Sequence, residues 1–154
     1  MPRLRKSPRL ADFDYVGPLA CHLTFVTRRR QPFFSDPHLA SICIEAMQVT
    51  VQRFCATVAA YCVMPDHVHI LVAIEEGTSL TDFAKHFKQL LGFRLKRVTR
   101  QPVWQISYHD HVLRREESLL DVARYIWENP VNEGLVPLRT EYPFSGPREL
   151  LEQA

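Results

Sequence analysis

The chain has 154 residues, of which 46% are hydrophobic and 23% are charged, with a formal net charge of +2. This length suits one domain with its own core, and the apolar stretches are too short to cross a bilayer. The basic N-terminus leads into no apolar segment typical of a signal peptide, so we expect a cytoplasmic protein. The four cysteines contain no Cys-x-x-Cys pair, and we expect reduced core thiols rather than a zinc knuckle or redox centre at Cys21, Cys43, Cys55 and Cys62.

Positive charge is concentrated in two parts of the chain. Residues 1–30 carry seven Lys or Arg against two Asp, and residues 81–100 carry six against one Asp. The rest of the chain is therefore acidic. Two basic blocks predict a surface for a polyanion if folding brings them together, or otherwise two solvated faces that aid solubility.

The first half of the chain predicts a strand, a helix and a pair of strands. Alternating side chains over residues 18–28 are typical of a strand. Ser35-Asp36-Pro37 is a helix start, so we expect a helix over 37–53. Residues 56–63 and 67–74 predict neighbouring antiparallel strands. The buried stripe of the helix is expected at Ile42, Ala46, Val49 and Phe54.

The second half predicts a basic helix, a further strand and a last helix. Apolar residues recur at helical spacing from Leu80 to Leu95, within a helix that starts at Thr78 or Ser79 and ends near Arg97. The cations that fall largely off this stripe are Lys85, Lys88, Arg94, Lys96 and Arg97. Residues 104–113 predict a strand. The last helix should run from Ser118 to about Asn129, because Pro130 disfavours helical geometry before it; its stripe is expected at Leu119, Val122, Ala123 and Ile126.

The order of elements predicts an α+β fold. Strand, helix, two strands, helix, strand and helix match a ferredoxin-like or RRM-like sandwich, in which helices pack on an antiparallel sheet. We expect residues 1–14 to be a basic flexible arm and residues 15–136 to be the folded domain. Residues 137–154 are expected to form a tail that either packs over the functional site or extends the surface.

Two histidines lie one residue apart in the predicted strand 67–74. Side chains alternate along a strand, so His67 and His69 must project from the same face, close enough to bind one ion. The pattern also occurs where each ring only packs in a core, and by itself it leaves both readings open. Asp66 precedes the pair and either orients a histidine or shapes the turn.

Tyr125 and Asn129 lie four residues apart on the last predicted helix. Residues at this spacing share a helix face, so the phenol and the amide can address the same point. If the helix crosses the sheet, that point could be the pair of histidines. The alternative is a tyrosine at the edge of the core with its hydroxyl in water.

Three ordered segments resemble a known family. They are Met64–Val72 (MPDHVHILV), Trp104–Arg114 (WQISYHDHVLR) and Arg124–Val136 (RYIWENPVNEGLV). Together they are similar to the single-tyrosine HUH transposases, the IS200-like transposases. Within that superfamily they look closest to the REP-associated tyrosine transposases. The resemblance runs from about Tyr15 to Val136.

The resemblance implies a metal-dependent endonuclease and strand transferase that acts through a 5′-phosphotyrosine. It implies His67 and His69 as metal ligands and Tyr125 as the nucleophile, with Mg²⁺ or Mn²⁺ as the ion. Asn129 matches the position of a further polar ligand, although its short side chain leaves direct coordination open. The implied substrate is single-stranded or hairpin DNA from REP-like palindromes. The implied protein is associated with the nucleoid and acts as a monomer, with a dimer as the alternative.

DNA phosphates are expected to contact the basic segments. The residues predicted for this role are Arg28, Arg29 and Arg30 after the first strand, together with Lys85, Lys88, Arg94, Lys96 and Arg97 on the basic helix. Stacking on unpaired bases by Trp104, Tyr108 or Trp127 is a weaker prediction than packing. Surface or packed positions are likewise favoured for His109, Asp110 and His111, and His22 is a plausible neighbour of the site.

Two alternative functions belong to other classes of protein. A non-catalytic hairpin-binding module of RRM-like fold would keep the basic surfaces and cut nothing. A zinc-stabilised structural domain is disfavoured because no cysteine lies at ligand spacing to the histidines. The complete set of His67, His69, Tyr125 and Asn129 favours the enzyme.

Overall fold

The computed structural model describes residues 18–105, 108–113 and 117–154. Its strands are β1 (Leu19–Val26), β2 (Thr57–Met64), β3 (His67–Ile74), β4 (His109–Val112) and β5 (Ser145–Gly146). Its helices are α1 (Pro37–Arg53), α2 (Leu80–Thr99), α3 (Leu119–Asn132) and α4 (Arg148–Gln153), with short 3-10 turns at Arg28–Arg30, Phe33–Ser35 and Arg139–Glu141. No described helix combines the length and apolar character that a membrane span needs.

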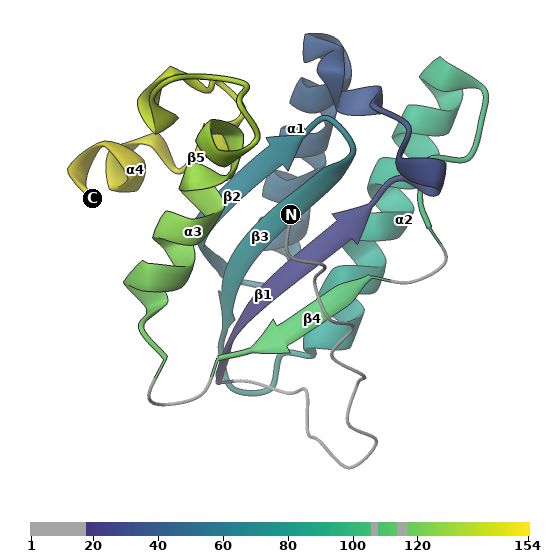
Figure 1. The fold of residues 1–154 in the computed structure, drawn as a ribbon. Helices are drawn as coiled ribbons and strands as arrows, with labels where there is room; N and C mark the ends of the chain where they lie inside the picture. Colours follow the sequence, from purple (N-terminus) through teal and green to yellow (C-terminus); the bar gives the residue numbers. More distant parts are fainter. Residues whose placement is uncertain (1–17, 106–107, 114–116) are drawn as a thin grey trace.

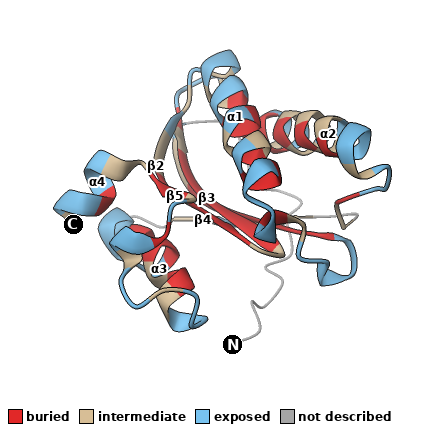
Figure 2. Cartoon of the chain, turned by 90° about the horizontal axis from the view of Figure 1, so that it is seen from above, coloured by how far each residue is buried: buried red, intermediate tan, exposed pale blue. Residues whose placement is uncertain are grey.

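The strands form one antiparallel sheet in the order β4-β1-β3-β2-β5 (Figure 1). Helices α1 and α2 cover one face of the sheet, and α3 and α4 lie on the other (Figure 2). The predicted α+β sandwich is therefore confirmed, with β3 at the centre of the sheet. Every residue of β3 except Ala73 is buried, as expected for a strand that is covered on both faces.

Side-chain alternation divides the core into two layers. Under α1 and α2, the strands contribute Cys21, Leu23, Phe25, Val68, Ile70 and Val72. Under α3, the core is smaller and includes Cys62, Met64, Leu71, Ile126 and Trp127. His67 and His69 alternate with Val68 and Ile70, so they face α3.

Local sequence signals explain where the long helices begin. The side chains of Asp36, Ser79 and Ser118 accept hydrogen bonds from backbone N–H groups in the first turns of α1, α2 and α3. Each cap satisfies a donor that the helix itself leaves unpaired. The predicted starts of these three helices are confirmed.

The structure corrects the predicted end of the last helix. We expected it to stop at about Asn129, but α3 continues through Pro130 to Asn132. Proline near a C-terminus removes one hydrogen bond without ending the helix, because the following backbone is still paired. Glu133 N–H donates to the Asn129 carbonyl, and Leu135 N–H donates to the Pro130 carbonyl.

One further prediction about an element is wrong in part. The strand predicted over 104–113 is β4 at His109–Val112, with Trp104 in an isolated bridge to Thr27 and residues 106–107 outside the described part. Trp104 instead packs inward, where its indole N–H donates to the carbonyl of Lys88. Backbone hydrogen bonds flank the bridge, from Arg28 N–H to the Val103 carbonyl and from Gln105 N–H to the Val26 carbonyl.

Burial also departs from prediction at three positions. Val49 and Leu119 are exposed because each lies at the edge of its helix stripe rather than over the sheet. Cys55 is exposed as well, in the turn after α1, where its φ is +49°. The other three cysteines are buried core thiols, as predicted; burial raises the pKa of Cys21 to about 12.

Residues 137–154 extend the sheet beyond β2. Strand β5 pairs with Tyr61 and Cys62, and the Tyr142 hydroxyl donates to the Val63 carbonyl. Tyr142 and Leu151 are buried in the core under α3. The segment is thus packed against the fold, whereas the predicted arm at residues 1–14 lies outside the described residues.

Candidate active site

The two histidines lie on the central strand, on the face that α3 covers. His69 is fully buried and His67 is 3% exposed. Their ring centroids are 4.8 Å apart, with the rings nearly perpendicular. In the sheet, His69 pairs with Thr24 of β1 and Cys62 of β2, while His67 pairs with Val26 and Met64. The prediction that the two imidazoles share a face is borne out by this register.

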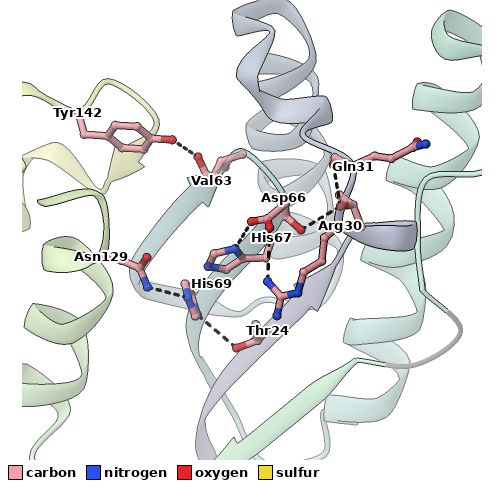
Figure 3. A network of polar contacts seen from close by, with 10 residues as sticks. Thr24, Arg30, Gln31, Val63, Asp66, His67, His69, Asn129 and Tyr142 are labelled. Carbon is pink, nitrogen blue, oxygen red and sulfur yellow. Dashed lines mark hydrogen bonds and ion pairs between the residues drawn. The ribbon is translucent and has the colours of Figure 1, made fainter. Parts of the chain in front are cut away.

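His67 is oriented by the residue before it. Its Nδ1 lies 2.7 Å from Oδ1 of Asp66, whose other oxygen is 3.4 Å from the Arg30 guanidinium (Figure 3). A carboxylate only accepts, so Nδ1 of His67 carries a hydrogen, and in the neutral form of the ring the lone pair is on Nε2. The hydrogen bond from His67, together with Arg30, holds the pKa of Asp66 below its ordinary value. Asp66 thus orients the histidine, as one of the two sequence readings proposed.

His69 has partners on both ring nitrogens. Its Nε2 lies 3.1 Å from the amide nitrogen of Asn129, and its Nδ1 lies 2.9 Å from Nε2 of His22 and 3.2 Å from the hydroxyl of Thr24. Figure 3 shows Asn129 reaching from α3 toward His69, with Thr24 on the opposite side of the ring. Burial lowers the pKa of His69 well below its ordinary value, so the imidazole is neutral and keeps a lone pair.

Helix α3 places Tyr125 at the mouth of the same site. Its ring centroid lies 6.2 Å from those of His69 and His22, each in an edge-on arrangement. Tyr125 is 41% exposed, whereas Asn129, one turn further along α3, is 5% exposed. The structure therefore brings together His67, His69, Tyr125 and Asn129, with the phenol open to solvent and the amide at the base of the site.

Two polar atoms in this site lack a partner. Among the described residues, the buried side-chain nitrogens and oxygens without a hydrogen bond are Nε2 of His67 and Oδ1 of Asn129. Both are acceptors, and both belong to residues around His69. Buried acceptors usually have a partner, and a bound cation is one partner that such acceptors can take. The donor set of two imidazoles and one amide oxygen therefore fits a divalent metal ion.

The described part of the chain holds no group of three or more His, Cys, Asp or Glu side chains arranged for a metal ion. A metal site here thus depends on Asn129 as its third protein donor. The amide nitrogen faces His69, and rotation of the amide by half a turn would exchange it for the oxygen. Asn129 is therefore the residue on which direct coordination depends.

The structure separates the two predicted basic groups. Arg28, Arg29 and Arg30 follow β1 and are exposed, with Arg30 contacting Asp66 beside the site. The cations of α2 lie on the helix that covers the opposite face of the sheet (Figure 2). Contacts of either group with DNA remain predictions, but the two groups do not form one patch around Tyr125.

The structure also shows where several weaker candidates from the sequence lie. Trp127 is buried and its indole N–H donates to the carbonyl of Gly146, and Trp104 and Tyr108 pack against Phe25. These three aromatics are packing residues, as favoured. His111 is exposed and contacts Glu117. His22 is indeed a neighbour of the site, whereas sequence reasoning missed Thr24; its place two residues from His22 on the same strand face was the available signal.

Comparison with protein families identifies a match to most of the chain. Residues 15–129 match the family described as Transposase IS200 like, which is most of the chain. The chain therefore belongs to the IS200-like transposase family, and the family resemblance noted in the sequence is confirmed.

Two curated proteins are similar to this chain. The REP-associated tyrosine transposase of Escherichia coli strain K12 is 27% identical over 86 residues, which cover 56% of this chain and 51% of the relative. A protein of Haemophilus influenzae, provisionally given the same name, is 26% identical over 112 residues, covering 65% of this chain and 64% of the relative. The chain thus spans less than two thirds of the length of these curated relatives.

Solved structures share the fold. A REP-associated tyrosine transposase bound to a REP hairpin superposes with a TM-score of 0.72 at 21% identity, over 85% of this chain and 78% of that one. A structure from Deinococcus radiodurans, provisionally described as a transposase, gives a TM-score of 0.58 at 24% identity, over 74% of this chain and 92% of that one. Both support the α+β architecture.

Proposed function

We propose that this protein is a metal-dependent nuclease and strand transferase that acts on single-stranded DNA next to a hairpin. The observation that carries the proposal is the convergence of Tyr125 and Asn129 on His67 and His69, with an unpaired buried acceptor on His67 and another on Asn129. Membership of the family and the REP-associated relatives support the substrate class. Action on genomic palindromes would place the protein with the nucleoid.

Tyr125 is the proposed nucleophile. Its oxygen attacks a backbone phosphorus, the bond from phosphorus to the 3′ oxygen breaks, and the products are a 5′-phosphotyrosine and a free 3′-hydroxyl. The phenol gives up one proton and the leaving oxygen takes one up. One phosphodiester replaces another, so the linkage retains its energy and a 3′-hydroxyl can later displace Tyr125 and join strands. Exposure of the phenol fits a nucleophile that a strand must reach.

The buried part of the site prepares this reaction. Asp66 holds His67 with its Nε2 free, and Asn129 contacts the Nε2 side of His69. These residues would hold Mg²⁺ or Mn²⁺, which when bound polarises phosphate oxygens and offsets the charge that develops on them. Because the ligand histidines are buried and positioned on the central strand, they need little rearrangement to act.

The basic groups would contact different parts of the DNA. Arg28–Arg30 lie near the site and would bind phosphates of the strand that reaches Tyr125. The exposed Lys85, Lys96 and Arg97 on α2 face away from that site and would bind a separate segment, such as the hairpin stem. We propose that one copy of the chain performs both contacts as a monomer.

The test is a cleavage assay with labelled hairpin DNA that carries single-stranded flanks from palindromic repeats of the source genome. The wild-type protein should give a covalent adduct with Mg²⁺ or Mn²⁺ and none with chelator. Tyr125→Phe should bind the hairpin and form no adduct. Tyr61→Phe is the matched control, because Tyr61 is a half-buried tyrosine packed against the core under α1 and α2, and its adduct yield should equal that of the wild type.

Two results would overturn the proposal. Adduct formation by Tyr125→Phe would remove the nucleophile. Tight hairpin binding with no cleavage in any metal, across several repeats and flanks, would establish the rival function of a non-catalytic hairpin-binding module.

A further inference from the structure

One histidine beside the proposed metal ligands, His22, has no role in the proposed chemistry. It lies on β1, is 9% exposed, and sits on the sheet face that α3 covers. Its Nε2 is 2.9 Å from Nδ1 of His69, and its ring centroid is 5.0 Å from that of His69. His22 therefore contacts the ring of a proposed ligand on the side opposite to Asn129.

The two ring nitrogens of His69 face different partners, and this separation constrains its tautomer. A neutral imidazole carries one hydrogen, so an imidazole that binds a cation through Nε2 must carry that hydrogen on Nδ1. Nδ1 of His69 is fully buried, and a buried N–H without an acceptor is costly. The nearest polar atom is Nε2 of His22 at 2.9 Å, which accepts when it carries no hydrogen, and the Thr24 hydroxyl follows at 3.2 Å.

We propose that His22 is a positioning residue: its Nε2 accepts the Nδ1–H of His69 and holds His69 in the tautomer whose Nε2 lone pair faces Asn129. This inference rests on the proposed metal site, which it deepens. His67 obtains the same tautomer from the Asp66 carboxylate. The two ligands thus present Nε2 to the ion for the same reason, with a carboxylate as acceptor on one side and an imidazole on the other.

As the partner of His69, the His22 imidazole differs from a carboxylate in its charge. A second negative charge beside His69 would be buried under α3, where an unpaired charge is costly. A histidine supplies an acceptor without adding charge. His22 also has its ring edge-on to Tyr125, so one side chain contacts both the metal-ligand histidine and the proposed nucleophile.

The experiment compares three variants of the full chain without metal and with Mn²⁺. His22→Phe keeps a ring beside Tyr125 and removes the acceptor, and His22→Gln restores an acceptor oxygen. Thr24→Val removes the weaker contact and leaves His22 in place. Nitrogen-15 NMR of the imidazoles reports the tautomer of His69 in the metal-free protein, and electron paramagnetic resonance reports Mn²⁺ affinity.

The wild type and Thr24→Val should show the hydrogen of His69 on Nδ1. His22→Phe should shift His69 toward the other tautomer and weaken Mn²⁺ binding by about 10- to 100-fold, the effect seen when the partner of a ligand histidine is lost. His22→Gln should retain Mn²⁺ affinity within a few-fold of the wild type. Retained affinity in His22→Gln would show that the hydrogen-bond acceptor at position 22 matters, rather than the packing of the ring.

Three outcomes would overturn the inference. They are a wild-type His69 with its hydrogen on Nε2, an unchanged tautomer and Mn²⁺ affinity in His22→Phe, or a loss in His22→Gln as large as in His22→Phe. If His22→Phe does not fold, the inference is still tested by the tautomer of His69 in the wild type and by the Mn²⁺ affinity of His22→Gln. A wild-type protein that has the predicted tautomer but binds no Mn²⁺ would overturn the proposed metal site and leave the role of His22 standing.

Discussion

Adding Mn²⁺ or Mg²⁺ to the metal-free protein should raise its melting temperature. The ion would pair with Nε2 of His67 and Oδ1 of Asn129, the two buried acceptors without partners. A buried polar group without a partner costs about 1–3 kcal/mol, so relief at both atoms provides about 2–6 kcal/mol in favour of the metal-bound fold. The proposed metal site therefore predicts that ion binding stabilises the folded state.

The size of the shift follows from the length of the chain. An ion at 100 times its dissociation constant stabilises the folded state by about 2.7 kcal/mol. For 154 residues, an unfolding entropy of about 2.1 cal/mol/K per residue gives roughly 0.3 kcal/mol/K in total. The melting temperature should therefore rise by about 8 °C at this ion concentration.

Differential scanning fluorimetry across a titration of either ion measures this shift. His69→Ala should lose it. His86→Ala is the matched control, because His86 bonds to Thr50 between α1 and α2, away from the site, and its metal-dependent shift should equal that of the wild type. A wild-type protein whose melting temperature ignores both ions, or a His69→Ala protein that keeps the full shift, would refute the reasoning.

Three other perturbations test separate parts of the structure. Asp66→Ala should weaken Mn²⁺ binding by about 10- to 100-fold in resonance titrations, because His67 loses the partner that fixes its ring; unchanged affinity would contradict this. Replacing Lys96 and Arg97 by Gln should reduce the slope of log affinity for hairpin DNA against log salt by about 1.4–1.8, with no loss of adduct at saturating DNA. An unchanged slope would exclude these two side chains from phosphate contact. Trp127→Phe should lower the free energy of unfolding, measured by urea denaturation, by about 1 kcal/mol, because the hydrogen bond to the Gly146 carbonyl is lost. An unchanged free energy of unfolding would contradict this prediction.

The fold was predictable because its main signals are local and repeated. Alternation in β1, the β-rich run of β3, and the caps at Asp36, Ser79 and Ser118 indicate most elements without knowledge of tertiary contacts. The same alternation put both histidines on one face. These features depend on the period of the backbone, which the sequence displays directly.

Features that depend on tertiary contacts were not predictable. Strand β5 has two residues and α4 has six, and both exist because the segment pairs with β2 and buries Tyr142. The contact of Arg30 with Asp66 joins two turns that are far apart in sequence. Likewise, a basic helix pattern cannot tell which face of the sheet α2 will cover, so it could not show that its cations lie away from Tyr125.

The position of α3 connects stability with the proposed chemistry. Between Tyr125 and Asn129, the helix presents Ile126 and Trp127 to the core, and both are buried. The same turn that anchors the helix therefore fixes how far the exposed phenol stands from the buried amide. A helix held at this point cannot slide toward the sheet to bring Tyr125 inward without disturbing Trp127. For the proposed reaction, the DNA strand would therefore have to come to the phenol at the mouth of the site, because the phenol cannot move inward to meet the strand.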